Sequence, residues 1–336
     1  MEKITIYKIA EKAGVSPKTV SRVINMEPTV SKKTYERVYK IIKETNFLPN
    51  ISAQRLASNK IKAIGLVIPR IGSPYASELI SVILNKCKEF RYISVVYPMD
   101  SESKEYKDVL ALYLQRHVDG FIIAPPGGDD EFFLNNIKEY NIPTILITPN
   151  RPYKDFYIVK AADKDGGYQA TKYLIDLGHK RIGIITCDLS RTFSQERLEG
   201  YKQALIESNV PIDIELIKNG DNSFRSGFSA AKQLISGKNP PTAIFACNDE
   251  MALGVESAIY KLGLRIPDDF SLIGFDDIPL ISELSVPLTT IRQPVRDIGG
   301  LAVALLIKLI KVKKIENKIY EIPIELIVRN SCKSII

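Results

Sequence analysis

The hydrophobic positions of the first 60 residues follow the period of short helices. Apolar residues recur three and four positions apart over residues 6–13, which predicts a first helix. Thr5 can cap its first turn, and Gly14 tolerates the positive φ that a sharp turn requires. The pattern therefore predicts a helix that ends in a tight turn.

A second helix is predicted directly after this turn. Ser16 is a good N-cap and Pro17 suits the first helical position, because its missing N–H costs nothing there, so the helix runs to about Asn25. A third helix, capped by Ser31, runs to about Asn46 and completes a small core. These elements together predict a helix-turn-helix unit.

Beyond residue 62 the pattern changes to apolar runs that alternate with helical stretches. Buried parallel strands are predicted at "AIGLVIP", "ISVVYP", "GFIIAP" and "TILIT", and then at "RIGIIT", "IELI", "AIFAC" and "SLIGF". Helices are predicted near residues 76–90, 104–116, 131–139, 166–177, 194–208, 225–236 and 249–262. The alternation predicts two doubly wound parallel-sheet α/β lobes, with a cleft at the carboxyl ends of the strands.

The net positive charge is confined to the start of the chain. Residues 1–62 hold 13 Lys and Arg and 5 Glu, a net charge of +8, and because the whole chain carries +7, the remaining residues carry −1. A basic run is usually a solvated face. A compact basic module on a nearly neutral body is nevertheless the charge distribution expected for binding a polyanion.

The second helix has an apolar stripe of only Val20, Val23 and Ile24, so the rest of its surface faces outward. Lys18 and Arg22 are four residues apart on one face, and the planar donors of arginine suit the N7 and O6 atoms of guanine in the major groove. Short donors suited to phosphate oxygens are Ser16, Thr19, Ser21, Asn25 and Ser31. The alternative is that all of these are ordinary caps and exposed polar residues of a small helical domain.

Composition and cysteine spacing narrow the class of protein. A chain of 336 residues, 45% hydrophobic and 25% charged, is long enough for a large core and more than one domain. Its start lacks the apolar region of a signal peptide, and its longest apolar stretch, near residues 301–307, is too short to cross a bilayer, so we expect no membrane partner and a cytoplasmic location. Reduced thiols, without a metal site or a disulfide framework, are expected at the widely spaced Cys87, Cys187, Cys247 and Cys332.

Catalytic signatures are missing from the sequence. It has no G-x-G-x-x-G after a strand, no G-x-x-x-x-G-K-[ST], no H-E-x-x-H and no G-x-S-x-G. The two histidines, His117 and His179, lie beside Arg116 and Lys180 at apparent helix ends. We therefore expect no enzyme and no cofactor. The alternative to a DNA-binding protein is a solute-binding protein without DNA function, which the basic first fifth and the missing signal peptide both oppose.

Several motifs, in order along nearly the whole chain, resemble the lactose-repressor (LacI/GalR) family. "TIYKIAEKAGVSPKTVSRVIN", "VSKKTYERVYKIIKETNFLPN" and "SAQRLAS" are similar to its DNA-binding head and hinge; "RLEGY", "PTAIFACNDEMALG", "DFSLIGFDD" and "PLTTIRQP" resemble its core signatures. The resemblance implies a helix-turn-helix domain at 1–49, a hinge at 50–60, and a periplasmic-binding-protein-like, effector-binding core at 61–336. Within that core it implies three crossovers, which we expect near Lys160, Ile291 and Pro323, with lobe 1 at about 61–160 and 292–322 and lobe 2 at about 161–291 and 323–336.

The predicted hinge is far shorter than an isolated helix requires in water, so alone it should be disordered. In the family this segment folds on the operator; the resemblance implies that Leu56 wedges into a central base step while Ala53 and Ala57 let two hinge helices approach closely. The alternative is a plain linker. The predicted DNA-binding set is completed by Thr5, Tyr7, Pro17, Thr34, Asn50 and Gln54.

The resemblance also implies an effector site in the cleft. Residues matching Arg197, Asn248 and Asp276 hydrogen-bond the effector in the family, often through sugar hydroxyls. Further predicted contacts are Ser73, Tyr75, Phe224 and Gln293. Core packing explains the two aromatic residues equally well. For Asp249 we favour the role of N-cap of the following helix.

Two positions depart from the family pattern. Arg70 and the stretch Thr148-Pro149-Asn150-Arg151 stand where aspartates are common. A more cationic cleft would favour an anionic effector such as a sugar acid or phosphate. The alternative is that Arg70 and Arg151 face solvent.

The family's mechanism is allosteric: effector binding shifts the paired lobes of a homodimer and changes its affinity for a near-palindromic operator, typically by a coupling of ~1–3 kcal/mol. The chain ends six residues after "IVRN" without leucine heptads, so we expect a dimer and not a tetramer. A protein corepressor is an alternative to a small-molecule effector, since some members respond to one.

Overall fold

The computed structural model describes residues 4–24, 29–45, 47, 61–68, 71–99, 106–115, 117–124, 131–151, 153–312 and 318–336. The chain divides into two compact units, Met1–Ile61 and Lys62–Ile336, which we call the head and the core. Each unit has its own hydrophobic interior.

The head contains the three predicted helices. Thr5 Oγ1 accepts a hydrogen bond from Lys8 N at 3.4 Å, and Ser31 Oγ accepts one from Thr34 N at the same distance, so both predicted caps are confirmed. Gly14 has a φ of 61°, as the predicted turn requires. The helices are α1 (Ile6–Ala13), α2 (Pro17–Ile24) and α3 (Lys32–Glu44). The small interior is formed by Ile9, Ala10, Ala13, Val20, Val23 and Val38.

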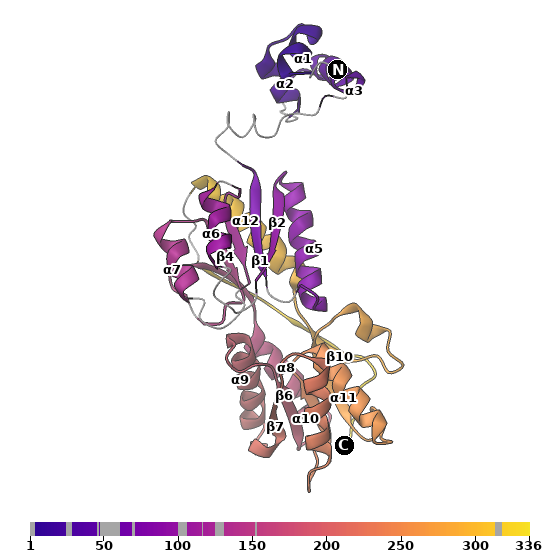
Figure 1. Ribbon diagram of the computed structural model, residues 1–336. Coiled ribbons are helices and arrows are strands. Elements are labelled where there is room, and N and C mark those ends of the chain that lie inside the picture. The colour runs from indigo at the N-terminus through magenta and orange to yellow at the C-terminus, as the bar shows by residue number, and fades with distance from the viewer. Residues whose placement is uncertain are drawn as a thin grey trace. The chain divides into compact units, whose positions relative to one another are not determined.

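Lobe 1 of the core is built on a six-stranded parallel sheet in the order β11-β5-β4-β3-β1-β2. Helices α5 and α12 pack together on one face, while α6 and α7 cover the other (Figure 1). The strands are β1 (Ala63–Ile68), β2 (Ile93–Pro98), β3 (Phe121–Ile123), β4 (Thr144–Ile147), β5 (Tyr157–Ala161) and β11 (Ile319–Ile322). The helices are α5 (Pro74–Glu89), α6 (Tyr106–Leu114), α7 (Glu131–Glu139) and α12 (Val295–Val312).

Lobe 2 repeats this plan with a second six-stranded sheet, ordered β12-β10-β9-β8-β6-β7, in which only the β10–β12 pairing is antiparallel. Helices α8 and α9 pack together, as do α10 and α11, and the two pairs flank the sheet (Figure 1). The strands are β6 (Ile182–Thr186), β7 (Ile217–Asn219), β8 (Ala243–Ala246), β9 (Ser271–Asp276), β10 (Thr289–Arg292) and β12 (Glu325–Ile327). The helices are α8 (Asp163–Asp176), α9 (Thr192–Glu207), α10 (Phe224–Ile235), α11 (Asp249–Lys261) and the short 3₁₀ helices η1 (Ile214–Leu216) and η2 (Pro279–Ser282).

The chain passes between the two sheets three times: between β5 and α8, between β10 and α12, and between β11 and β12. Because β10 and β12 pair with each other, the crossover that follows β10 and the crossover that precedes β12 adjoin neighbouring strands of lobe 2. Both sheets have helices on both faces, which confirms the predicted pair of doubly wound lobes.

Two sequence predictions about individual strands were wrong. "ISVVYP" was predicted as a buried strand, but β2 is the edge of its sheet, and Ile93 is 50% exposed. "IELI" was predicted as a strand, whereas η1 occupies its first three residues and β7 begins only at Ile217. An apolar run alone does not distinguish a central strand from an edge strand.

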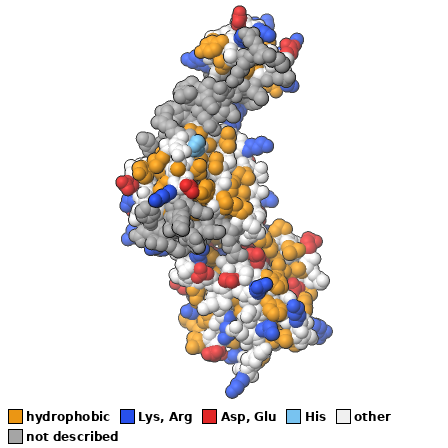
Figure 2. Space-filling view, viewed as in Figure 1, with side chains coloured by type: hydrophobic (Ala, Val, Ile, Leu, Met, Phe, Trp, Pro, Cys, Tyr) orange, Lys and Arg blue, Asp and Glu red, His pale blue; other side chains and the backbone are white. Residues whose placement is uncertain are grey.

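On the face seen in Figure 2, both lobes expose hydrophobic side chains with charged residues interspersed among them. The four cysteines are free thiols, three of them buried. Among the helices that the structure describes, none is both long enough and apolar enough to span a membrane.

Candidate functional site

The second helix of the head has the two-sided arrangement that its sequence predicts. Val20 and Val23 are buried against the other helices, whereas Lys18 is exposed and Arg22 is partly exposed. Ser16 Oγ accepts a hydrogen bond from Thr19 N at 3.1 Å, which orders the first turn. The N-terminal turn of α2 therefore presents polar side chains outward from a fixed backbone.

The remaining predicted DNA contacts of the head surround this helix in the sequence. Tyr7 on α1 is 72% exposed, and Ser31 Oγ donates to Thr34 Oγ1 at 2.9 Å at the start of α3. Six predicted DNA-binding residues lie outside the described residues: Asn25, Asn50, Ala53, Gln54, Leu56 and Ala57.

The core contains a cleft of about 410 Å³ lined by both lobes. The lining residues follow the carboxyl ends of strands from the two sheets, which is where doubly wound folds place ligands. Six of the seven predicted effector residues line it, namely Ser73, Tyr75, Arg197, Asn248, Asp276 and Gln293. The seventh, Phe224, is not among the lining residues; it begins α10 and its side chain is 48% exposed, so its role as an effector contact stays a prediction.

Arg197 is the most firmly held of these side chains. It is 3% exposed, and both its Nε and Nη2 lie 2.8 Å from Asp163 Oδ1, while Nη1 donates to the carbonyl oxygen of Cys247. Its guanidinium carbon lies 3.6 Å from the ring centroid of Phe275. Burial, the largest single influence, would lower the pKa of Arg197, but Asp163, Asp276 and two nearby cysteines together outweigh it and raise that pKa, so the guanidinium stays charged.

Asp276 is the acceptor that faces this cation across the cleft floor. It ends β9 with a φ of 122°, and Gln293 Nε2 donates to its Oδ1 at 2.7 Å. Burial raises the pKa of Asp276 to about 6, against the opposing influence of Arg197 and of the hydrogen bond from Gln293. Asp276 therefore gains a proton within the mildly acidic range.

Asn248, which lines the cleft, also has the cap role that the sequence analysis assigned to Asp249. Asn248 is the N-cap of α11, because its extended backbone lets Oδ1 accept from Met251 N at 2.9 Å, and its Nδ2 donates to Asn222 O at 3.2 Å. Asp249 is the first helical residue and is fully buried, so its predicted cap role was wrong. Its carboxylate instead accepts hydrogen bonds from distant segments of lobe 2.

The cleft also contains residues that the sequence analysis did not select: Cys187, Arg191, Phe193, Asn222 and Glu250. Each of them follows a strand or stands near the start of a helix, a signal too common to identify them from one sequence. Arg191 Nη1 donates to Asn150 Oδ1 at 2.7 Å, a contact from lobe 2 to lobe 1. Asn222 Oδ1 is buried without a hydrogen-bond partner among the described atoms, and so is an acceptor for a bound donor.

The described cleft does not have the cationic excess that two departures from the family pattern suggested. Arg151 is exposed, with its guanidinium 5.9 Å from the ring centroid of Tyr153, and does not line the cleft, while Arg70 lies outside the described residues. The charged side chains that line the cleft are Arg191, Arg197, Glu250 and Asp276, two positive and two negative. No three His, Cys, Asp or Glu side chains of the described ranges are grouped so that they could hold a metal ion.

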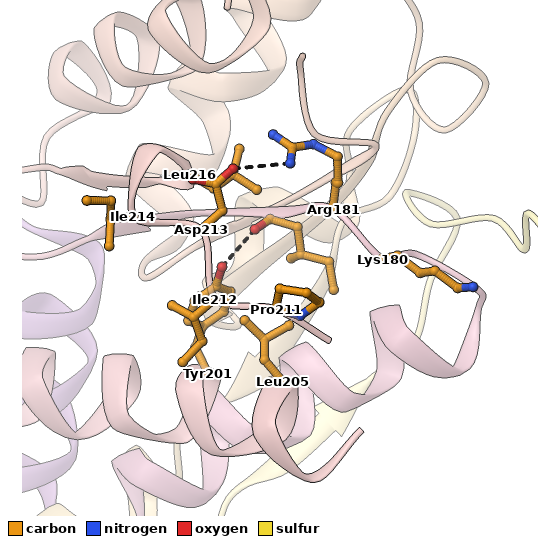
Figure 3. Close-up of a pocket in the computed structure, with 10 residues that line it drawn as sticks. Lys180, Arg181, Tyr201, Leu205, Pro211, Ile212, Asp213, Ile214 and Leu216 are labelled. Carbon is orange, nitrogen blue, oxygen red and sulfur yellow. Dashed lines mark hydrogen bonds and ion pairs between the residues drawn. The ribbon is translucent and has the colours of Figure 1, made fainter. Parts of the chain in front are cut away.

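A second hollow, of about 580 Å³, lies in lobe 2 away from the cleft (Figure 3). Its polar groups bond to one another: Arg181 Nη1 lies 3.1 Å from Asp213 Oδ2, and Tyr201 OH donates to Ile182 O at 2.8 Å. Lys180 points away from the hollow in this view. The walls of this hollow are mostly apolar and no set of polar groups converges in it, so the cleft is the better candidate for a ligand.

Comparison with known families gives a consistent result for both units. Residues 5–50 match the family described as "Bacterial regulatory proteins, lacI family", and residues 171–332 match a periplasmic binding protein-like domain. The HTH-type transcriptional repressor PurR of Vibrio vulnificus (strain CMCP6) is 34% identical over 98% of this chain and 99% of its own length. The HTH-type transcriptional regulator DegA of Bacillus subtilis (strain 168) is 37% identical over 89% of each chain.

Solved structures agree with this assignment. A lac repressor dimer bound to operator and the anti-inducer ONPF has a TM-score of 0.83 and 31% identity, covering 99% of this chain and all of that one. A complex of the transcriptional regulator CelR with cellobiose has a TM-score of 0.76 and 27% identity, covering 98% and 99% of the two chains. With its head and its core both matched in order and over nearly their full length, the chain belongs to the lacI family of bacterial regulatory proteins.

Proposed function

We propose that the protein is a repressor that binds a near-palindromic operator as a homodimer and responds to a small carbohydrate-type effector in the core cleft. The main support for DNA binding is the arrangement of α2. Its buried Val20 and Val23 leave Lys18 and Arg22 on the outward side of a basic head. A helix of this kind, presented by a small helical unit, fits the major groove. A regulator of this kind works where the DNA is, in the cytoplasm.

Within the head, Arg22 and Lys18 read base edges, and the hydroxyl groups around them bind phosphates and set the register. The proposal keeps the hinge residues predicted from the sequence as minor-groove contacts: Asn50, Ala53, Gln54, Leu56 and Ala57. Their roles rest on the sequence, because they lie outside the described residues.

The effector proposal rests on the hydrogen-bonding groups of the cleft. Asp276, Glu250 and the free Oδ1 of Asn222 accept hydrogen bonds, whereas Arg197 donates them, and neutral hydroxyl groups can satisfy both kinds of partner. The complex of the related CelR with cellobiose supports the same class of ligand. Titration calorimetry with ribose, glucose and cellobiose, beside gluconate and glucose 6-phosphate, separates neutral from anionic effectors; tight binding of the anions alone would overturn this proposal.

Allosteric control follows from the three crossovers between the lobes. A ligand bridging the lobes changes their relative position only by bending these segments, and a coupling of ~1–3 kcal/mol to operator affinity is typical of such transitions. Whether the effector releases or strengthens DNA binding depends on which lobe arrangement suits the operator.

The test is a selection from genomic DNA. The purified protein is mixed with sheared DNA of its source organism at near-physiological salt, and bound fragments are recovered and sequenced, with and without a metabolite extract. We expect enrichment of a near-palindrome with a flexible central step. Failure to enrich any site, also at low salt and with cell extract supplying a protein corepressor, would overturn the proposal.

A further inference from the structure

The loop that presents Asp276 to the cleft has an unusual backbone. Asp276 and Asp277 both have positive φ values, 122° and 63°, in a region that residues other than glycine seldom adopt. Two consecutive residues in this region are costly unless the surroundings hold them, and such positions gather at functional sites. The contacts that hold this loop therefore decide where the Asp276 carboxylate points.

Asp249 supplies the contact at the end of the loop. Its Oδ2 accepts a hydrogen bond from Ile278 N at 2.9 Å, and its Oδ1 accepts one from Thr290 Oγ1 at 2.7 Å. A Cβ at Gly274 would overlap Oδ1, so the carboxylate lies directly against β9. Asp249 thus joins α11, the loop after β9, and the crossover strand β10.

Asp249 does not line the cleft, although both of its sequence neighbours, Asn248 and Glu250, do. Its side chain points into lobe 2 and is fully buried, so the cap role does not explain it and ligand contact does not either. A buried carboxylate is retained at a cost, since burial raises the pKa of Asp249 by disfavouring its charged form.

The other side of the loop is held by Asp277. Its two carboxylate oxygens lie 2.7 Å from Arg292 Nε and 2.6 Å from Arg329 Nη2. Arg292 ends the crossover strand β10, and Arg329 follows β12. The loop is therefore fixed between α11 on one side and, on the other, β10 and the segment that follows β12.

We propose that Asp249 is a positioning residue, which holds the Asp276 loop in its ligand-binding conformation by accepting hydrogen bonds from Ile278 N and Thr290 Oγ1. This deepens the proposed function and rests on it, because Asp276 is taken as an effector contact. Asp249 sets effector affinity without touching the effector, and ties that affinity to β10, the strand that leads into one of the crossovers.

The first test needs no ligand. Hydrogen exchange is followed by mass spectrometry in the full-length wild type, in Asp249→Ala and in Asp249→Asn. Asparagine can still accept from Ile278 N and can donate to Thr290 Oγ1, so it should behave almost as the wild type does. We expect the alanine variant to exchange at least tenfold faster in peptides covering 276–283, with β6 and β8 unchanged. Unchanged exchange in this loop, or equally faster exchange throughout lobe 2, would overturn the inference.

The second test measures affinity by calorimetry with ribose, glucose and cellobiose. We expect Asp249→Ala to weaken the best of these probes at least tenfold, and Asp249→Asn to restore most of the affinity. The matched control is Asp213→Ala, which removes a hydrogen-bonded aspartate of lobe 2 away from the cleft and should leave affinity unchanged. Equal losses in Asp249→Ala and Asp213→Ala would contradict a positioning role.

Two other experimental results are also informative. If Asp249→Ala does not fold, Thr290→Val removes one of the two hydrogen bonds and should show a smaller increase in exchange confined to the same loop; no increase would contradict the inference. If no probe binds the wild type, the carbohydrate effector is wrong, while the exchange data still decide whether Asp249 holds the loop.

Discussion

The two candidate recognition surfaces, α2 in the head and the cleft in the core, are held in place over very different sequence distances. The caps that order α2 and α3 join residues three positions apart, such as Ser16 with Thr19 and Ser31 with Thr34. The bonds that fix Arg197 and Asp276 in the cleft join residues 17 to 50 positions apart, such as Gln293 with Asp276 and Arg197 with Cys247. A surface built from local contacts tolerates change in the rest of the chain, whereas the cleft depends on the whole core.

The largest loss of stability is expected from breaking the buried ion pair between Arg197 and Asp163. Arg197→Ala leaves the buried Asp163 carboxylate without its cation, and breaking a buried ion pair in this way typically costs about 3–5 kcal/mol. Denaturant unfolding of the core should show this loss, and calorimetry should show loss of effector binding.

A double variant separates charge from packing. Asp163→Asn with Arg197→Met removes both charges, so it should recover much of the stability without recovering effector binding. A loss below about 1 kcal/mol in Arg197→Ala would mean that the buried pair does not organise the cleft.

In the head, Arg22→Ala should affect DNA recognition. It should weaken operator binding by about 1–3 kcal/mol and relax the preference at one base position, because one bidentate contact is lost. Competition binding against operators with single base changes measures both effects. Lys40→Ala on α3 removes the same charge elsewhere and should lower affinity evenly across sequences. Unaltered affinity and preference in Arg22→Ala would show that α2 does not read DNA.

The expected pH dependence is that of effector binding in the cleft, and not that of DNA binding by the head. The pKa of Asp276 is raised to about 6, and its ionised form is the better acceptor for ligand hydroxyl groups. Effector affinity should therefore be constant above pH 7 and fall as pH drops through 6, by at most about tenfold per pH unit for one proton. Calorimetry of the wild type and Asp276→Asn checks this, since the variant should lack the dependence. A persistent dependence in Asp276→Asn would assign it to another group.

The smallest effects are expected from alanine substitutions at two glycines, one in the head and one in the core. Gly14 and Gly263 both have positive φ values, 61° and 75°, with open space where a Cβ would lie. Alanine at either position should cost about 1–2 kcal/mol through backbone strain alone. Gly14→Ala should lower operator affinity by loosening the turn before α2, whereas Gly263→Ala should leave it unchanged. Equal effects on DNA binding would mean that the head's turn has no special role.

The same difference in contact range explains what the sequence could predict. The caps at Thr5 and Ser31, the Gly14 turn and the alternation of strands and helices are local signals, and the structure confirms them. Six of the seven predicted effector residues line the cleft, four of them within the family motifs, while their roles remain predictions. The order of strands in each sheet came from no local signal, and so the edge position of β2 was missed.

The error at Asp249 has a structural cause. A single sequence shows that a polar residue precedes a helix, but the cap is decided by backbone conformation, and here Asn248 has the extended one. The true partners of Asp249, Ile278 and Thr290, are 29 and 41 positions away and could not be found by spacing.

We propose that operator binding by the head and effector binding in the cleft are allosterically coupled. Operator affinity is measured by fluorescence anisotropy with the selected site, without and with a saturating effector, and effector affinity is measured without and with saturating operator. Thermodynamic linkage requires the two affinities to change by the same factor, which we expect to be about 5- to 150-fold. An operator affinity that stays constant while the cleft fills would contradict the account.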